Sequence, residues 1–273
     1  MGLVTTSVGP VECLEAGRGL PLLVLHGTPG GSDQALAAAR VLGVDAHVLA
    51  PSRPGYLETP LSTGRTPSEQ ADAMVALLDE LRVEAAVVLG ASGGGMVAVD
   101  LAARHPARVR GLVLWSAVTG PMRIWSGPLL HGPLARRSTG EAVVRLVQRF
   151  PGLLVGRAAN DQSAVDAALA LAGTVFPIGP RRDGLANDTR QARSLAPDVA
   201  ARVTAPTLIV HGTKDRNVAY GQATRAAKSI PHARLVTVRG ANHWTTLADR
   251  TAQAALRGFL ADIAGSARSG AEI

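Results

Sequence analysis

Three features are scarce in this sequence of 273 residues: cysteine, aromatic side chains and long apolar runs. The single cysteine, Cys13, excludes an internal disulfide, and the 3% aromatic content predicts a core built from Ala, Val and Leu. Apolar runs such as LPLLVLHG are far shorter than the roughly 20 residues that a membrane-spanning helix needs. The opening segment also lacks the basic and apolar parts of a secretory signal. We therefore expect a cytoplasmic protein without a membrane span.

Acidic residues are also in short supply, with 21 Asp and Glu against 28 Lys and Arg, for a formal net charge of +7. A basic balance of this kind can indicate nucleic acid or another anionic partner. The basic residues are scattered, however, and no dense run of them has aromatic residues interleaved. We therefore expect no nucleic-acid partner.

Apolar runs of strand length alternate with longer patterns of helical periodicity. The runs are continuous, which is typical of strands that helices bury on both faces. They cover residues 21–27, 46–52, 85–91, 111–117, 206–212 and 234–240. The helical patterns cover residues 32–42, 67–82, 93–105, 217–229 and 245–264. This alternation predicts an α/β fold with a mostly parallel, doubly wound sheet and helices on both faces.

The two ends of the chain and the start of one helix carry further local signals. The segment LVTTSVGPVECLEAG, residues 3–17, suits one added antiparallel hairpin. Thr66 followed by Pro67 is a suitable start for the helix over 67–82. The closing segment 265–273 is polar and small, and we expect it to be frayed.

The alternation of strand and helix stops between about residues 119 and 197. This stretch has scattered Pro and Gly, helical patterns near 139–150 and 161–172, and no convincing parallel strand. Its arginines outnumber its acidic residues, so it is net basic. We predict a helical cap, or lid, at 119–197, inserted into a core formed by 1–118 and 198–273.

The most distinctive stretch is GASGG, residues 90–94, where an apolar strand ends and a helical pattern begins at once. Glycines at Gly90 and Gly94 would let the strand and helix backbones approach closely around a serine held in a strained turn. The N–H groups at the start of the helix would then face negative charge that develops near the serine. We predict that Ser92 is a nucleophile, the alternative being a glycine-rich turn with an incidental serine.

A serine nucleophile needs a histidine as its general base. Three of the seven histidines, His26, His211 and His243, lie where apolar strands end, and catalytic groups of open α/β sheets gather at the carboxyl ends of strands. The chain order Ser, Asp, His favours His243, because it follows every candidate acid. We predict His243 as the base, against the alternative of a histidine in a surface loop.

The histidine in turn needs an acid that orients it. Asp215 follows the strand over 206–212 directly and precedes His243 by 28 residues. The other usual position for the acid follows the strand over 111–117, and no acidic residue occurs there before Glu141. We predict Asp215 as the orienting acid, rather than a solvated aspartate of the loop.

The glycine-rich loop LHGTPGG follows an early strand and offers backbone N–H groups for an oxyanion hole. Thr28 is the expected donor from this loop, and Gly93 is the expected donor beside the nucleophile. We expect His26 to shape the loop rather than to take part in chemistry.

Five segments in this order resemble the α/β-hydrolase superfamily, in its serine-hydrolase form with a helical cap. They are HGTPGG (26–31), APSRPGY (50–56), GASGG (90–94), HGTKD (211–215) and GANHW (240–244). Relatives with such loops and caps include esterases, lactonases, aminopeptidases, epoxide hydrolases, dehalogenases and cofactor-free haloperoxidases. Dehalogenases and epoxide hydrolases would need Asp at the position of Ser92. The segment RRDGLANDT (181–189) resembles the stretch where such caps rejoin the core, which implies a structural role.

The resemblance and the Ser92, Asp215, His243 set imply a serine hydrolase that forms an acyl-enzyme and needs no metal or organic cofactor. An enclosed pocket under a cap favours a small-molecule acyl substrate: a small, largely apolar ester, lactone or thioester. Several alternatives use the same fold: acyl transfer, perhydrolysis of the haloperoxidase type, a lyase or cyclase reaction, a peptidase like the prolyl aminopeptidases, and a small-molecule-sensing binding protein. The peptidase would need acidic cap residues to hold a substrate amine, and this cap is sparsely acidic.

Two further groups of side chains bear on the pocket. Trp125 and Trp244 could line it, with a plain packing role as the alternative. Two arginine pairs in the cap, at 136–137 and 181–182, could attract an anionic substrate, but we expect them to be solvated surface residues.

Overall fold

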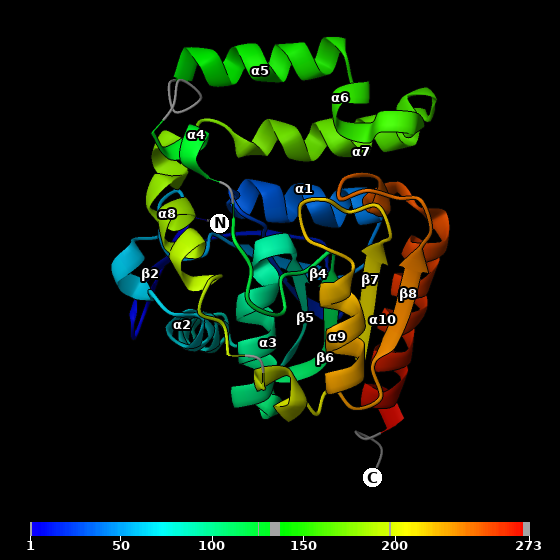
Figure 1. The fold of residues 1–273 in the computed structure, drawn as a ribbon. Helices are drawn as coiled ribbons and strands as arrows, with labels where there is room; N and C mark the ends of the chain where they lie inside the picture. Colours follow the sequence, from blue (N-terminus) through cyan, green and yellow to red (C-terminus); the bar gives the residue numbers. More distant parts are fainter. Residues whose placement is uncertain (1, 125, 132–136, 197, 270–273) are drawn as a thin grey trace.

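The computed structural model describes residues 2–124, 126–131, 137–196 and 198–269, which are built around one eight-stranded sheet (Figure 1). The strands are β1 (Leu3–Thr6), β2 (Gly9–Ala16), β3 (Pro21–Leu25), β4 (His47–Pro51), β5 (Ala86–Ala91), β6 (Val109–Trp115), β7 (Thr207–Gly212) and β8 (Arg234–Val238). Their order across the sheet is β1-β2-β4-β3-β5-β6-β7-β8. The pairs β1/β2 and β2/β4 are antiparallel, and all other neighbours are parallel. The predicted mostly parallel sheet with an opening antiparallel hairpin is confirmed.

Helices cover both faces of the sheet, because alternate residues of each buried strand point to opposite sides. On one face α1 (Ser32–Leu42) and α10 (Arg250–Ser269) pack against Leu22, Val24 and their counterparts in the neighbouring strands. On the other face α2 (Pro67–Glu80), α3 (Gly95–Arg104) and α9 (Gly221–Ser229) pack against the residues of opposite parity. The predicted doubly wound architecture is therefore confirmed.

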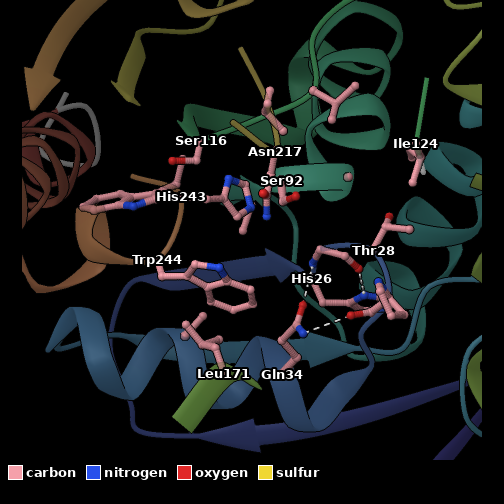
Figure 2. A pocket seen from close by; sticks show the side chains of 18 of the residues that line it. His26, Thr28, Gln34, Ser92, Ser116, Ile124, Leu171, Asn217, His243 and Trp244 are labelled. Atoms are coloured by element: carbon pink, nitrogen blue, oxygen red, sulfur yellow. Dashed lines mark hydrogen bonds between the residues drawn. The ribbon is translucent and has the colours of Figure 1, made fainter. Parts of the chain in front are cut away.

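The parallel strands run in the same direction, so their carboxyl ends meet at one edge of the sheet. The residues that follow β3, β5 and β6 are His26, Ser92 and Ser116, and all three line a cavity at this edge (Figure 2). The topology thus gathers polar side chains from distant parts of the sequence around one space.

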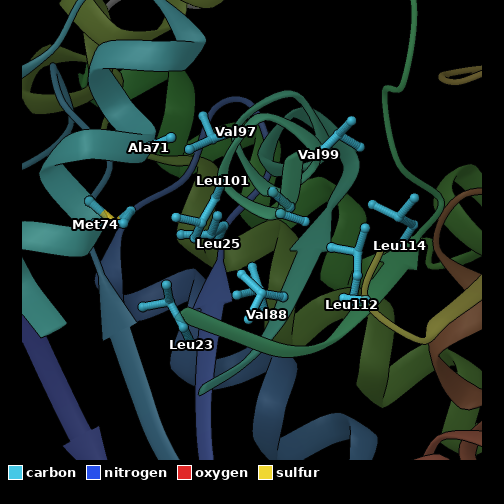
Figure 3. Close-up of a cluster of buried hydrophobic side chains, with 14 of the residues drawn as sticks. Leu23, Leu25, Ala71, Met74, Val88, Val97, Val99, Leu101, Leu112 and Leu114 are labelled. Atoms are coloured by element: carbon cyan, nitrogen blue, oxygen red, sulfur yellow. The ribbon is translucent and has the colours of Figure 1, made fainter. Parts of the chain in front are cut away.

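The layer between the sheet and helices α2 and α3 is almost entirely aliphatic (Figure 3). Leu23, Val88 and Leu112 point from three neighbouring strands toward Met74 and Leu101 on the helices, and all five side chains are fully buried. Burial of one such side chain contributes about 1.5–3 kcal/mol to the stability of the fold. A core of Val, Leu and Ala agrees with the low aromatic content of the chain.

Most helix boundaries agree with the sequence patterns, but the start of α9 and both ends of α10 do not. Helix α2 starts at a capping box, in which the Thr66 hydroxyl accepts the Glu69 N–H at 3.2 Å and the Glu69 carboxylate accepts the Thr66 N–H at 3.0 Å. Helix α9 begins at Gly221 instead of residue 217, which leaves 217–220 in the loop that borders the cavity. The expectation of a frayed segment 265–273 is wrong as far as Ser269, because α10 continues to that residue.

Between β6 and β7 the described residues form helices and no strand (Figure 1). The helices are α4 (Gly127–Leu130), α5 (Arg137–Arg149), α6 (Gly152–Val155), α7 (Gln162–Ala172) and α8 (Arg182–Gln191). Helix α7 lies between α5 and α1, so this segment is stacked on the helical layer that covers one sheet face. No single helix in the described part of the chain is long and apolar enough to cross a membrane, although a bent pair, 162–175 with 179–191 at 88°, has sufficient length and apolar content.

Candidate active site

Ser92 lies at the turn between β5 and α3 in a left-handed backbone conformation, with φ of 50°. A non-glycine residue rarely adopts this conformation, which costs on the order of 1–3 kcal/mol. The flanking glycines make the turn possible, because a Cβ on Gly90 would lie 2.6 Å from that of Ala98 and one on Gly94 would meet the backbone of Leu25 and His26. The strained turn presents the Ser92 side chain to the cavity.

Asp215 and His243 form a direct hydrogen bond, with 2.7 Å between His243 Nδ1 and Asp215 Oδ2. Asp215 follows β7, and His243 follows β8 in the loop before the last helix. The Asp215 carboxylate is buried, whereas the His243 ring is 13% exposed and lines the cavity together with Ser92 (Figure 2). With Nδ1 bonded to Asp215, Nε2 of His243 is the ring nitrogen that remains for proton exchange with a group in the cavity.

Asp215 accepts hydrogen bonds on both oxygens. Its Oδ1 accepts the N–H groups of Asn217 and Val218, each at 2.9 Å. Its Oδ2 is shared by His243 and His211, whose Nε2 lies 3.3 Å away. Burial alone would raise the pKa of Asp215, but the bonds from His211 and His243 hold this pKa well below its usual value. The carboxylate is therefore ionised throughout the neutral range and fixes the orientation of the His243 ring.

His211, at the end of β7, is a second partner of Asp215 that the sequence did not reveal as such. Its Nε2 also lies 2.9 Å from the carbonyl oxygen of Val218, which can only accept, so Nε2 carries the proton. The ring is fully buried, and its Nδ1 has no partner among the described residues. The spacing of four residues in HGTKD was the available signal.

The loop that carries His243 is held by its neighbour Asn242, another residue that the sequence patterns did not single out. The Asn242 side-chain oxygen accepts the N–H groups of Trp244 and Thr245, each at 3.0 Å. Its amide group donates to the carbonyl of Leu154, at 2.9 Å, in the segment between β6 and β7. Trp244 lines the cavity and packs edge-on against the His243 ring at 5.9 Å between centroids.

The glycine-rich loop after β3 lies directly against the Ser92 turn. A Cβ on Gly27 would lie 3.1 Å from the Ser92 Cβ, and one on Gly93 would collide with the Thr28 side chain. Gln34 braces the loop from α1, since it accepts the Gly27 N–H at 2.9 Å and donates to the Pro29 carbonyl at 3.1 Å (Figure 2). The Thr28 N–H donates to no group in the described part of the chain, which leaves it available to an oxyanion.

His26 is built into this loop rather than presented to solvent. Its Nε2 accepts the Arg53 backbone N–H at 2.9 Å, so the proton must reside on Nδ1, which donates to the Gly27 carbonyl at 2.7 Å. Complete burial, together with the positive charge of Arg53, lowers the pKa of His26 well below its usual value. The neutral ring therefore serves to shape the loop, in agreement with the role expected for it.

A second buried aspartate, Asp188 of α8, joins the segment between β6 and β7 to this loop. Arg53 forms a two-pronged ion pair with Asp188, at 3.0 Å to Oδ1 and 2.6 Å to Oδ2, and both side chains are at most 1% exposed. Tyr56 donates to Asp188 Oδ2 at 2.6 Å, and the Thr28 hydroxyl donates to the same oxygen. The Arg53 guanidinium also donates to the His26 carbonyl at 3.1 Å. The structural role expected for the segment 181–189 is supported by these contacts.

The cavity at this edge of the sheet has a volume of about 390 Å³ and is mostly apolar inside. Ser92, His243, Thr28 and Gly93 all line it. In the described part of the chain, no three His, Cys, Asp or Glu side chains come together as potential metal ligands. The predicted nucleophile, base and two oxyanion donors thus line one cavity together with Trp244.

The predictions made for the arginine pairs of the cap and for Trp125 have different outcomes. The expectation that Arg181 is a solvated surface residue is wrong, because it is 2% exposed and forms an ion pair with Asp33. Arg182 is exposed as expected. Trp125 and Arg136 lie outside the described residues, and so does the side chain of Arg137.

An eight-stranded, mostly parallel sheet with a strained serine after β5, and with a histidine and an aspartate after the last two strands, defines an α/β hydrolase. The chain belongs to the α/β-hydrolase family, because the family model described as alpha/beta hydrolase fold matches residues 21–248. It is therefore an enzyme of the hydrolase class.

Three relatives illustrate the range of this family. An alpha/beta hydrolase fold protein from Nakamurella multipartita has a solved structure that is 33% identical, covers 96% of this chain and 99% of its own, and superposes with a TM-score of 0.82. The pimeloyl-[acyl-carrier protein] methyl ester esterase of Aromatoleum aromaticum is 32% identical over 81% of this chain and 90% of its own. A 2-hydroxymuconate semialdehyde hydrolase of Pseudomonas putida is 28% identical over 91% of this chain and 89% of its own.

Proposed function

We propose that the protein is a serine hydrolase that cleaves small carboxylic esters, lactones or thioesters through an acyl-enzyme. The observation that carries the proposal is the Asp215–His243 hydrogen bond of 2.7 Å beside a cavity that the strained Ser92 also lines. A histidine oriented by a buried carboxylate and a serine at a strained turn are the two groups that acyl transfer to water requires.

In the proposed reaction His243 Nε2 takes the proton of the Ser92 hydroxyl while Ser92 Oγ attacks the substrate carbonyl carbon. The N–H groups of Thr28 and Gly93 stabilise the negative charge on the tetrahedral intermediate. The intermediate collapses when His243 donates its proton to the leaving group, which produces an ester between the acyl group and Ser92. Water, deprotonated by His243, then attacks this ester, and His243 returns the proton to the Ser92 oxygen as the acid is released. In the described chain Ser92 Oγ makes no hydrogen bond, and such contacts often tighten only when substrate is bound.

We further propose that residues 119–197 act as a cap over a core formed by 1–118 and 198–273. Met122, Ile124, Leu171 and Val175 from this segment line the cavity, which supports a role in enclosing substrate. The mostly apolar lining favours a substrate with an apolar group, and the Aromatoleum relative is named as a pimeloyl-[acyl-carrier protein] methyl ester esterase.

Covalent labelling with a fluorophosphonate probe tests this proposal. The wild-type protein is expected to label with one equivalent of probe, and Ser92→Ala is expected not to label. Ser116→Ala is a matched control, because Ser116 also lines the cavity and its hydroxyl, among the described residues, hydrogen-bonds only to the Thr246 hydroxyl, at 3.3 Å. A wild-type protein that does not label, or a Ser92→Ala protein that labels as well as wild type, would refute the assignment of Ser92.

Hydrolysis is distinguished from acyl transfer, perhydrolysis or a lyase reaction by turnover in H₂¹⁸O. Hydrolysis of an aryl ester puts one heavy oxygen into the released acid. An acid without the label, or a product that retains the acyl group on another acceptor, would contradict the hydrolytic outcome.

A further inference from the structure

The cavity beside Ser92 has two unlike walls. One wall belongs to the apolar cluster on the α1 and α10 side of the sheet and carries no charge, and its side chains come from Val24, Ala38, Trp115, Leu171, Trp244 and Leu247. The other wall belongs to a separate small cluster, to which Val118, Met122, Ile124 and Val218 contribute. Figure 2 shows Asn217, from this second wall, on one side of Ser92, with Trp244 and Leu171 on the other side. A substrate carbonyl at Ser92 would therefore have different surroundings on its two sides.

Among Arg, Lys, Asp and Glu, the described lining of the cavity holds only positively charged residues, and these are sequence neighbours of second-wall residues. Arg123 and Arg216 line the cavity there, next to Ile124 and Asn217, and no Asp or Glu among the described residues lines it. Asp215 is close in sequence, but its carboxylate is fully buried and bonded to two histidines. The two arginines therefore line the cavity without a carboxylate among the described lining residues to neutralise them.

Some arginines of the chain have their guanidinium groups paired with a carboxylate, and the two arginines of the cavity do not among the described residues. Arg53 pairs with Asp188, Arg181 with Asp33 and Arg108 with Asp79. Arg123 and Arg216 form neither an ion pair nor a side-chain hydrogen bond with any described residue. A guanidinium offers five N–H donors in a planar fork that matches a carboxylate, so these unused donors suit an anionic ligand.

We propose that Arg123 and Arg216 form a carboxylate subsite, and that the substrate is an ester with an apolar group on one side of the scissile carbonyl and a carboxylate on the other. This inference rests on the proposed serine-hydrolase function and narrows it. The apolar wall disfavours a charged group, because an unpaired charge against Val24 and Leu171 would lose its hydration. The arginine wall favours an anion, because it offers that charge a positive partner. The orientation of the substrate would follow from this asymmetry.

Two isosteric pairs of aryl esters test the proposal and show which side of the ester carries the anion. The acyl-side pair is the 4-nitrophenyl ester of glutaric acid and that of glutaric monoamide. The alcohol-side pair is 4-carboxyphenyl butyrate and 4-carbamoylphenyl butyrate, each corrected for its rate of hydroxide hydrolysis. In one pair the wild-type kcat/KM for the anion is expected to exceed that for the amide about tenfold. This ratio should fall as salt is added, because both arginines are exposed.

The substitution Arg123→Gln together with Arg216→Gln should bring the anion-to-amide ratio close to one. Arg239→Gln removes the same charge from an exposed position that does not line the cavity, and it should leave the ratio as in wild type. An amide cleaved as well as the anion in both pairs, or a preference that survives in the double variant, would overturn the proposal.

Binding to Ser92→Ala protein separates this inference from the proposed function, because binding needs no turnover. Calorimetry should show the anionic member of one pair bound more tightly than its amide, and the absence of a difference in both pairs counts against the subsite. A wild-type protein that labels with fluorophosphonate and cleaves amide and anion equally would refute the subsite alone. A protein that neither labels nor cleaves any ester would refute the serine-hydrolase function.

Discussion

Asp215 and Asp188 are both buried aspartates with several hydrogen bonds, and their partners differ in one essential property. Asp215 binds His211 and His243, whose rings can gain and lose a proton. Asp188 binds Arg53, which keeps its proton under all ordinary conditions, together with the hydroxyls of Tyr56 and Thr28. The first aspartate is thus placed to support proton transfer, and the second is placed to hold a structure.

The partners of the two aspartates also differ in their access to the cavity. The His243 ring is 13% exposed and lines the cavity, so a proton can pass between it and a bound substrate. The Arg53 side chain has no exposed surface, and the charge of Asp188 raises the already high pKa of Arg53 despite the opposing effect of burial. Asp188 therefore fastens α8 to the loop that carries Thr28, without a chemical role of its own.

The largest expected effect comes from the reactive aspartate. Asp215→Asn keeps the shape of the side chain but replaces an oxygen that accepts from His243 with an NH2 group that donates. The His243 ring is then left in the wrong tautomer. We expect kcat/KM for an aryl ester to fall about ten-thousandfold. A stopped-time assay with active-site titration measures the loss, and a melting curve close to that of wild type would confirm an intact fold. A folded Asp215→Asn protein with near wild-type activity would exclude Asp215 as the orienting acid.

The matching change in the structural aspartate is expected to act on stability. Asp188→Asn leaves the Arg53 charge buried without compensation, which should lower the free energy of unfolding by about 3–5 kcal/mol. Denaturant titration measures this change. Asp183→Asn is the control, because Asp183 is an exposed aspartate in the same helix.

Replacing both members of the pair distinguishes a charge effect from simple loss of contacts. Arg53→Met with Asp188→Leu removes both charges and should recover part of the stability that Asp188→Asn loses. The double variant could instead lose more free energy of unfolding than the single variants Arg53→Met and Asp188→Leu lose together. That result would show that the polar network itself, through Tyr56 and Thr28, holds the fold.

The same contrast explains what the sequence allowed us to predict. Ser92 lies in a glycine-rich turn, and Asp215 and His243 directly follow apolar strands, so short local patterns locate all three. The parallel sheet then brings their strand ends to one edge, which is a property of the fold class. The mostly parallel sheet with helices on both faces followed from the same alternation of patterns.

No short sequence pattern predicted the network of hydrogen bonds around Asp188. Arg53 and Asp188 are separated by 135 residues, and Arg181 and Asp33 by 148. An arginine in a polar stretch is normally exposed, so burial of Arg53 and Arg181 depends on a partner that only the folded chain supplies. The sequence patterns did not place Arg123 and Arg216 in the cavity lining for the same reason, since this depends on how the segments after β6 and β7 fold against the sheet.

A histidine in the structural network should respond to pH differently from the pair around Asp215. His26 is buried and neutral, and its pKa is well below the value of 6.5 that it would have in the unfolded chain. Below pH 6.5 the unfolded state therefore binds a proton that the folded state does not, so stability falls with falling pH, by about 1.4 kcal/mol per pH unit. The lowered pKa of Asp215 affects stability only near and below pH 3.8 and leaves this window untouched.

Denaturant titrations between pH 6.5 and 5 measure the contribution of His26. His26→Gln, whose side-chain oxygen can still accept the Arg53 N–H, should flatten the slope, whereas His232→Asn removes an exposed histidine and should keep it. A slope that is the same in wild type and His26→Gln would show that His26 does not cause the loss of stability.

The smallest expected effect concerns His211, which touches Asp215 but not the cavity. His211→Leu removes the donor 3.3 Å from Asp215 Oδ2, and we expect kcat to fall about tenfold with KM nearly unchanged, because Asp215 then orients His243 less firmly. His211→Gln can place an N–H near the position of Nε2 and should recover most of the activity. If His211→Leu and His211→Gln lose activity equally while both remain folded, the ring acts by filling space at the end of β7, and Asp215 is oriented by His243 and the two backbone N–H groups alone.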